Sequence, residues 1–455
     1  MPIMPHALHA LAATLLVAIA PSQARADDSQ PGPYAVSQRT VTVTRSNGTT
    51  FTAQIRYPAT STAASSPFDN AAAPAPALTF GHGFLSPVDI YDSTMDHLAS
   101  HGYVVIATTS GGELFPNHAN YAVDMRQCLT WLEQQDALKT SWLAGRIDET
   151  RFAVGGHSMG GGASALAAAA DTRIKALCTL AAAETNPSSS SAMGSVQVPS
   201  CFIVGTQDTI VPPSTTAAQY NACDAPRQTV SITGGSHCGF VDSPIIACDS
   251  GSLSRPEQLA KTRALMLRFL NAQLRGDALA YAAVWGAGAQ VAGTTMQRDA
   301  RTSASLGQPS LEGPAGTTLA TTLQVTNAGP DATAIAPRAT VAGIAVTFDP
   351  PVSASLAAGA SASFTVRATA SSPVAATATI DAVRVRDGAG ASLALALNFT
   401  AAANPADLDG NGVVDAADLA TLLAAWGPCS GCAADLDGSG TVDAADLATL
   451  LGAWG

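Results

Sequence analysis

The pentapeptide Gly-His-Ser-Met-Gly at positions 156–160 constrains the fold of this chain more than any other feature. Residues 151–155 before it have the apolar character of a strand, and the small residues 163–170 after it favour a helix. Flanking glycines fit a sharp strand-to-helix turn, where bulky neighbours would clash. Such a turn lifts the Ser158 hydroxyl above the edge of a sheet, at the amino end of a helix. The pattern therefore predicts a nucleophilic serine in an α/β fold.

Residues 32–289 support this fold, because strand-like and helix-like stretches alternate along them. The apolar runs 103–107 and 202–205 are typical of parallel strands buried on both faces. Residues 121–134 and 257–274 have the apolar spacing of helices. Alternation of this kind predicts a mostly parallel sheet with helices on both faces.

His237 is the predicted general base, because no other histidine follows Ser158 in the chain. In folds with this serine motif, the acid and then the base follow the nucleophile. His237 also lies in a loop-like segment after the predicted strand 229–232. The alternative, a surface histidine with no chemical role, is disfavoured by this context.

Four carboxylates lie between the predicted nucleophile and base. Asp208 comes just past the carboxyl end of a predicted strand, where catalytic groups gather in open α/β sheets. Glu184 also follows a strand and is the alternative acid. We expect Asp171 to be a solvated residue at a helix end and Asp224 to be a turn residue. Asp208 is therefore the predicted acid.

Two backbone donors are predicted to bind the oxyanion. One is the N–H of Met159, at the amino end of the helix after the serine. The other should come from the loop after the strand 78–80, which reads Gly-His-Gly-Phe at 81–84. Its glycines let the backbone approach a substrate, so the N–H of Phe84 is the predicted second donor. His82 precedes Ser158, and chain order gives it a structural role.

These roles predict acyl transfer from an ester to water. Ser158 would lose its proton to His237 and attack the ester carbonyl, and an acyl-enzyme would form and be hydrolysed. Asp208 would orient and stabilise the imidazolium. Loss of one oxyanion donor typically costs about 3 kcal/mol. The predicted substrate is a carboxylic ester, either a small molecule or a polymer.

Four stretches resemble bacterial cutinase-like polyester hydrolases, whose wider group includes dienelactone hydrolases and platelet-activating-factor acetylhydrolase-like enzymes. The stretches are residues 100–105, 146–148, 156–162 and 205–212. The resemblance covers roughly residues 32–285 and implies an α/β-hydrolase fold with its active site in an open surface cleft. Polyester-cleaving members usually carry a Trp platform where this chain has Ala-Ala-Glu-Thr-Asn at 182–186. The resemblance implies that Ser158, Asp208 and His237 form a catalytic triad. It also implies that Phe84 and Met159 supply the oxyanion hole.

Residues 300–402 have a different character. Helical spacing disappears, and short Thr/Val/Ala-rich runs alternate with turn signals such as Asn-Ala-Gly-Pro at 327–330. Many short strands at such spacing predict an Ig-like β-sandwich. This segment contains no His or Cys, so we expect no catalytic role for it.

Residues 404–455 contain an internal repeat with a shift of 28 residues. Each copy places oxygen-bearing groups at positions 1, 3, 5, 7, 9 and 12 of a calcium loop, with a glycine at position 6. The alternative is a pair of solvated acidic turns. The predicted Ca²⁺ ligands are Asp407, Asp409, Asn411, Val413, Asp415 and Asp418 in the first copy, and Asp435, Asp437, Ser439, Thr441, Asp443 and Asp446 in the second.

This tail differs from a standard EF-hand, because position 12 is Asp and no helix precedes either loop. A duplicated loop followed by one helix resembles the type I dockerin module. The resemblance implies calcium-dependent folding and docking to a cohesin-like protein through loop positions 10 and 11. Both copies have Ala-Ala there, at 416–417 and 444–445.

The amino-terminal residues 1–26 predict a secretory signal peptide. An apolar run at 10–20 is followed by Ala-Arg-Ala at 24–26, a small-x-small cleavage site. The run is too short to span a bilayer, which needs about 20 apolar residues. We therefore expect a secreted protein with no membrane span.

All eight cysteines follow that site, and an even number of cysteines in an exported chain permits disulfides. Cys238 and Cys248 flank a segment beside His237, so a bond between them would brace the histidine loop; Cys223 is a competing partner. Cys178 and Cys201 are expected to be buried in strands.

The chain carries a net charge of −12, which argues against nucleic acid as a partner. The sequence as a whole favours a secreted serine hydrolase of carboxylic esters. The alternatives are a polysaccharide-acyl esterase attached to a scaffold by the tail, and a non-catalytic surface binding protein. The residues leave open the acyl and alcohol specificity and the oligomeric state.

Overall fold

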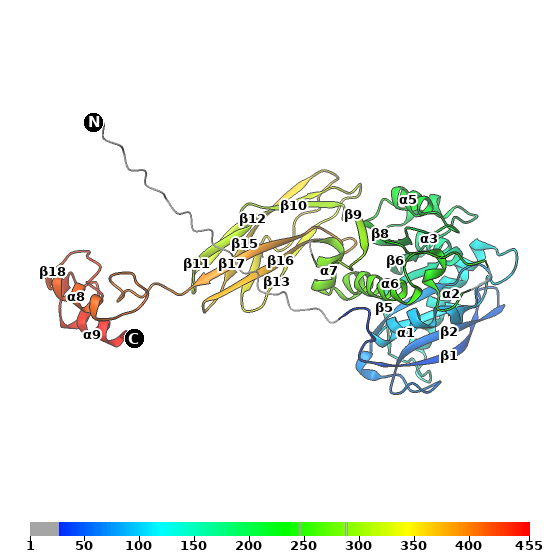
Figure 1. Ribbon diagram of the computed structural model, residues 1–455, viewed down its shortest axis with the longest axis horizontal. Coiled ribbons are helices and arrows are strands. Elements are labelled where there is room, and N and C mark those ends of the chain that lie inside the picture. Colours follow the sequence, from blue (N-terminus) through cyan, green and yellow to red (C-terminus); the bar gives the residue numbers. More distant parts are fainter. Residues whose placement is uncertain (1–26, 245–246, 287, 289) are drawn as a thin grey trace, which may run out of the picture.

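The computed structural model describes residues 27–244, 247–286, 288 and 290–455, which form three units in chain order (Figure 1). An α/β unit is followed by a β-sandwich and then, across an extended linker, by a small helical module at the carboxyl end. The predicted signal peptide, residues 1–26, lies outside the described residues. Across the described ranges, no helix combines the length and the apolar character needed to cross a membrane.

A nine-stranded sheet forms the α/β unit, in the order β1-β2-β4-β3-β5-β6-β7-β8-β9. The pairs from β4 through β8 are parallel, whereas β1, β2 and β9 join antiparallel to their neighbours. Every residue of the central strands β4 and β7 is buried, as parallel strands covered on both faces require. The strands are β1 (Ala35–Thr44), β2 (Thr50–Ala59), β3 (Ala75–Gly81), β4 (Val104–Thr108), β5 (Ile147–His157), β6 (Ile174–Leu180), β7 (Ser200–Gly205), β8 (Arg227–Ile232) and β9 (Thr294–Asp299).

Helices cover both faces of this sheet, and two separate apolar cores result. Residues of α2, α3 and α5 pack against one face, and residues of α1, α6 and α7 pack against the other. The expected fold class is therefore confirmed. The helices are α1 (Asp92–Ser100), α2 (His118–Ala137), α3 (Met159–Ala170), α4 (Ser189–Ala192), α5 (Pro213–Ala222), α6 (Arg255–Leu270) and α7 (Ala278–Trp285), with short turns η1 (Asn70–Ala72), η2 (Val88–Tyr91), η3 (Met193–Ser195), η4 (His237–Phe240) and η5 (Asn271–Arg275).

The β-sandwich consists of two four-stranded sheets, β10-β12-β15-β14 and β11-β17-β16-β13. Inward-facing residues such as Leu323, Val325 and Phe364 alternate with exposed polar ones and form its core. The strands are β10 (Thr302–Leu306), β11 (Ser310–Pro314), β12 (Thr318–Asn327), β13 (Ile335–Thr340), β14 (Ala345–Asp349), β15 (Ser361–Thr369), β16 (Val374–Arg384) and β17 (Ser392–Thr400).

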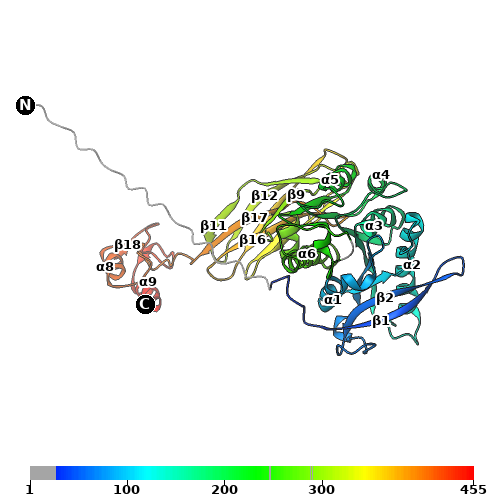
Figure 2. The same ribbon diagram turned by 45° about the vertical axis from the view of Figure 1, so that its right-hand side comes forward.

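The sandwich packs directly against the α/β unit (Figures 1 and 2). The α/β sheet continues past residue 289 through β9, and β10 begins at Thr302. The Tyr281 hydroxyl of α7 donates to the Gly390 carbonyl at 3.1 Å, and the Arg338 guanidinium lies 4.5 Å from the Tyr281 ring centroid. These contacts join the two units.

The carboxyl-terminal module contains α8 (Ala416–Ala424) and α9 (Ala444–Gly452), each of which begins at position 10 of one acidic loop. A two-residue pairing of β18 (Gly427–Pro428) with β19 (Thr441–Val442) joins the copies. Its small core is built from equivalent positions of the repeat, including Leu422 with Leu450 and Val414 with Val442. The repeat therefore folds as one unit in which each copy covers the other.

Candidate active site

Ser158 occupies the turn between β5 and α3 with φ 55° and ψ −120°, a left-handed conformation that a non-glycine residue seldom adopts. The neighbouring glycines are required because there is no space for a side chain at their positions. A Cβ at Gly156 would lie 2.6 Å from the Gly81 carbonyl oxygen, and one at Gly160 would lie 2.2 Å from the same carbonyl. The end of β3 therefore crosses directly over the turn. Backbone strain of this kind is characteristic of functional sites.

Asp208 and His237 are hydrogen-bonded to each other and buried. The Nδ1 atom of His237 lies 2.8 Å from Oδ2 of Asp208. The other carboxylate oxygen accepts the N–H groups of Ile210 and Val211 at 3.0 and 2.8 Å. With both oxygens bonded, the Asp208 carboxylate is fixed in orientation. Because Nδ1 faces Asp208, Nε2 is the nitrogen left to face a reacting group.

Ser158 and His237 lie on the same side of the site. The residue before the serine, His157, packs its ring against that of His237, with centroids 4.4 Å apart and planes inclined at 43°. Ser158 stands at the carboxyl end of β5, Asp208 follows β7 and His237 follows β8. Parallel strands deliver their carboxyl ends to one edge of the sheet, so the three predicted residues are brought to the same edge.

The carboxylate of Glu184, the alternative acid, contacts serines of α4. Its Oε2 atom accepts the hydroxyl of Ser190 at 2.6 Å and lies 3.2 Å from the Ser189 hydroxyl, so it binds the start of α4. Asp171 is not solvated, contrary to our expectation. It is 8% exposed and accepts Nη2 of Arg173 at 2.6 Å, because the end of α3 packs against that guanidinium. Asp224 is exposed beside Cys223, as a turn residue would be.

The two predicted oxyanion donors belong to segments at the sheet edge that carries the serine. Met159 is the first residue of α3, and Phe84 lies in the loop after β3. His82 is buried with its two ring nitrogens 2.9 Å from the carbonyl oxygens of Gly83 and Ser110. It therefore holds the Phe84 loop against the segment after β4, which agrees with a structural role.

Apolar side chains are exposed around this edge of the sheet. They belong to the loops after β3, β4 and β7, the same edge that carries the serine turn. The exposed fraction reaches 88% at Phe115. A hydrophobic rim next to the serine suits an apolar substrate. These residues, the apolar rim, are Phe84, Leu85, Leu114, Phe115 and Ile210.

The structure pairs Cys238 with Cys248 in a disulfide, which is one of the two pairings that the sequence allowed. Within the described chain Cys223 is a free, buried thiol, as are Cys178 and Cys201 in strands β6 and β7. Since Cys238 directly follows His237, the disulfide anchors the histidine loop. A second disulfide joins Cys429 and Cys432 between the two acidic repeats.

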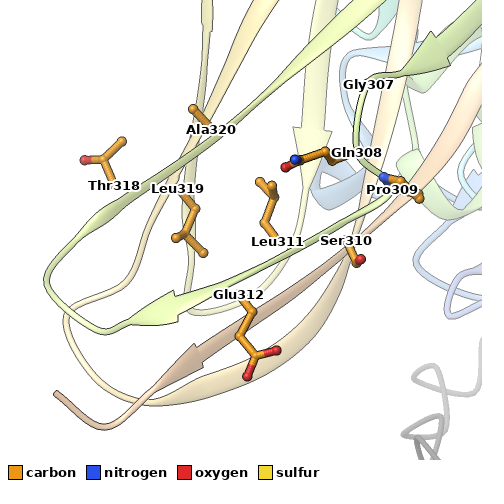
Figure 3. A pocket seen from close by; sticks show the side chains of 9 residues that line it. All are labelled: Gly307, Gln308, Pro309, Ser310, Leu311, Glu312, Thr318, Leu319 and Ala320. Carbon is orange, nitrogen blue, oxygen red and sulfur yellow. The ribbon is translucent and has the colours of Figure 1, made fainter. Parts of the chain in front are cut away.

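A groove of about 500 Å³ lies far from the serine, on the sandwich between β11 and β12 (Figure 3). Leu311 and Glu312 point to opposite sides of β11 there. Glu312 is the one ionisable residue among those described as lining it. This groove therefore offers no acid–base pair and does not compete with the site at Ser158.

The acidic repeats form two convergent oxygen clusters in the described tail. In each cluster, single carboxylate oxygens from three aspartates lie within 4.8 Å of one another. Gly412 and Gly440, at loop position 6, have φ of 93° and 88°, which the sharp turn of a calcium loop requires. The carboxylates that converge fit a Ca²⁺ ion, a hard cation that prefers oxygen ligands. They are Asp407, Asp409 and Asp418 in one loop and Asp435, Asp437 and Asp446 in the other.

Two positions show how loop and helix are connected. Asp415 and Asp443, at loop position 9, cap α8 and α9 by accepting the N–H groups of Ala417 and Ala445 at 2.8 Å. Position 9 of such loops often reaches the ion through a water molecule, which is compatible with this capping role.

The sheet order, the strained serine turn and the buried Asp–His pair define an α/β-hydrolase. A family model described as PET hydrolase-like matches residues 14–271, and the chain belongs to this family of hydrolases. A model of the type I dockerin domain matches residues 405–452. Dockerin type I domains bind Ca²⁺ and cohesin partners. No protein in a search of curated proteins matches the chain.

Three residues near the site were not predicted to assist it: Tyr91, His157 and Asp249. Tyr91 ends the short turn η2, and its hydroxyl accepts the Gly83 N–H at 3.0 Å and contacts His157. His157 is buried between Tyr91 and His237. Asp249 directly follows Cys248. The predicted disulfide at Cys248 is the one sequence signal that pointed toward this carboxylate.

Proposed function

We propose that this protein is a secreted serine esterase that cleaves carboxylic esters through Ser158, His237 and Asp208. The observation that carries the proposal is the 2.8 Å bond between His237 and Asp208, at the sheet edge that also presents Ser158. Membership of a hydrolase family supports it. An intact acid–base pair beside a strained serine argues against a purely structural binding protein.

The reaction begins when Nε2 of His237 takes the hydroxyl proton of Ser158. The serine oxygen attacks the ester carbonyl, and Asp208 stabilises the imidazolium. The resulting oxyanion is stabilised by the N–H groups of Met159 and Phe84. His237 then returns its proton to the leaving alcohol, which leaves an acyl-enzyme on Ser158. Water attacks this ester by the same steps in reverse order and releases the acid.

The substrate is expected to carry an apolar acyl or alcohol group. The apolar rim lies in loops at the sheet edge that carries the serine, and its exposed side chains include Phe84, Leu114 and Phe115. Burial of apolar surface stabilises a complex by about 25 cal/mol per Å². Long or polymeric esters could therefore lie across this rim.

Removal of acyl groups from polysaccharide is the second candidate function. The observation that favours it is the dockerin domain at residues 405–452, because a docked enzyme would be held beside an insoluble polymer. Ser158, Asp208 and His237 would have the same roles in both cases. Comparing acetylated polysaccharide with an apolar polyester as substrates separates the two candidates.

The remaining units have supporting roles in this proposal. After export and cleavage following Ala26, residues 32–289 together with β9 form the catalytic domain, 300–402 the Ig-like spacer and 404–455 the calcium-binding module that docks to a cohesin-like partner. The convergent aspartates and the dockerin match support Ca²⁺ binding by the tail. Asn411, Val413, Ser439 and Thr441 would complete the coordination, the second and fourth through their backbone carbonyls.

The test is hydrolysis of a p-nitrophenyl ester series, from acetyl to long acyl chains, by the wild type and Ser158→Ala. Ser66→Ala is the matched control, because Ser66 is a buried serine that lies near β1 and β2. We expect turnover by the wild type and the control and its loss in Ser158→Ala. Equal turnover by Ser158→Ala would refute the proposed nucleophile.

A further inference from the structure

The carboxylate of Asp249 joins the loop of the predicted acid to the loop of the predicted base. Its Oδ2 atom accepts the N–H of Thr209, the residue after Asp208, at 3.0 Å. The same oxygen accepts the N–H of His237 itself at 3.0 Å. Its Oδ1 atom accepts the N–H of Cys238 at 2.9 Å. One half-buried carboxylate thus holds three backbone donors from two separate loops.

Asp249 is ionised when it makes these bonds. Burial opposes the ionisation of its carboxyl, but the backbone N–H groups of Cys238, His237 and Thr209 outweigh burial, and the pKa of Asp249 lies below its ordinary value. Hydrogen bonds to an ionised acceptor are roughly twice as strong as neutral ones. The contact is therefore a strong link between the loops.

The segment that carries Asp249 is itself attached at both ends. The disulfide between Cys238 and Cys248 fixes Cys248, the residue before Asp249, to the histidine loop. The N–H of Ser252 donates to the side-chain oxygen of Gln207 at 2.7 Å, which fixes the segment to the aspartate loop. Asp249 is thus placed between two anchors that limit its movement.

We propose that Asp249 is a positioning residue, which sets the distance between Asp208 and His237 by holding the backbones of their two loops together. The inference rests on the proposed triad. The 2.8 Å bond between the two side chains joins loops that follow different strands, β7 and β8. Asp249 accepts the backbone N–H of His237 and that of Thr209, the residue after Asp208. It therefore acts on the bond between Asp208 and His237 through the backbones of their loops.

Two substitutions test the role. Asp249→Ala removes all three acceptor contacts, and Asp249→Asn keeps one oxygen but places an amide NH₂ against a backbone N–H. Asp242→Asn is the matched control. Asp242 is also half-buried and lies shortly after His237, but its oxygens accept the N–H and hydroxyl of Ser93 on α1.

The readouts are kcat and KM for a soluble p-nitrophenyl ester, melting temperature, and the downfield proton NMR signal of the His237–Asp208 hydrogen bond. We expect kcat to fall about 10- to 100-fold in both Asp249 variants, because small misplacements of a catalytic group cost this much. KM should change less than about twofold, since substrate contacts are untouched. The NMR signal should weaken or exchange faster in these variants. Asp242→Asn should keep the kcat, the KM and the NMR signal of the wild type.

A kcat within about twofold of wild type in a folded Asp249→Ala protein, with an unchanged NMR signal, would overturn the proposal. If Asp249→Ala does not fold, Asp249→Asn decides by the same two readouts. Failure of the triad looks different, because the wild type itself would then lack turnover that depends on Ser158. The NMR signal would still decide whether Asp249 controls the Asp208–His237 contact.

Discussion

The hydroxyl of Tyr91 lies 2.9 Å from Nδ1 of His157, and both groups are buried directly behind the serine turn. The same hydroxyl accepts the N–H of Gly83, in the loop that leads to Phe84. Burial raises the pKa of Tyr91 and lowers that of His157, so both are neutral at ordinary pH. The hydroxyl therefore connects the loop that carries Phe84 to His157, whose ring packs against His237.

Tyr91→Phe should destabilise the fold, because Gly83 and His157 each lose a buried hydrogen-bond partner. Each unsatisfied buried group costs about 1–3 kcal/mol, so we expect the free energy of unfolding to fall by about 2–4 kcal/mol. Urea unfolding measures it. Tyr34→Phe is the control, since its hydroxyl makes one exposed bond to the Ala71 carbonyl. Equal effects of the two substitutions would contradict the buried network.

The choice of acid can be tested by comparing two isosteric substitutions. Asp208→Asn should lower kcat by about 10⁴-fold, as expected when the histidine loses its orienting carboxylate. Glu184→Gln should leave kcat within about threefold, because its carboxylate binds the serines of α4. Ester hydrolysis by both variants gives the answer, and a larger loss in Glu184→Gln would move the acid to that position.

Stability should fall as the solution becomes acidic, partly because of His97. Burial, followed by the charges of His101 and Arg263, lowers the pKa of His97 from 6.5 to about 4. Below pH 6.5 the unfolded chain binds a proton that the folded chain rejects, so this contribution to stability declines from there to about pH 4.

His97→Gln removes this linkage. The change in unfolding free energy between pH 7 and pH 5 should be about 2 kcal/mol smaller in the variant than in the wild type. Urea unfolding at the two pH values measures the difference. Identical changes in both proteins would show that His97 does not titrate in this way.

Removal of Ca²⁺ should unfold the carboxyl-terminal module and leave the α/β unit intact. The converging aspartates repel one another without a cation, and metal binding contributes directly to folding in such loops. Limited proteolysis of the full chain should cleave the tail in EGTA but not in Ca²⁺, while ester turnover stays constant. Asp409→Asn combined with Asp437→Asn should reproduce the cleavage in Ca²⁺, whereas the exposed Asp349→Asn should not. Calcium-independent cleavage would argue against the ion.

Much of the fold was predictable because its signals are local. The serine motif at 156–160, the apolar runs of the parallel strands and the 28-residue repeat each depend on near neighbours in the chain. Chain order then restricted the base to His237. Residues that depend on distant contacts escaped prediction. Asp249 acts on Thr209, 40 positions earlier, and Asp171 is covered by Arg126 of α2, whose Nε atom lies 3.6 Å from its Oδ2 atom.

The most direct measurement is covalent labelling of the full chain with a fluorophosphonate, followed by mass spectrometry of the intact protein and its peptides. We expect one adduct per chain, on the peptide that contains Ser158. Labelling should vanish in Ser158→Ala, become much slower in His237→Ala and stay normal in Ser66→Ala. Unchanged labelling of Ser158→Ala, or an adduct on another residue, would contradict the assignment of Ser158 as the nucleophile.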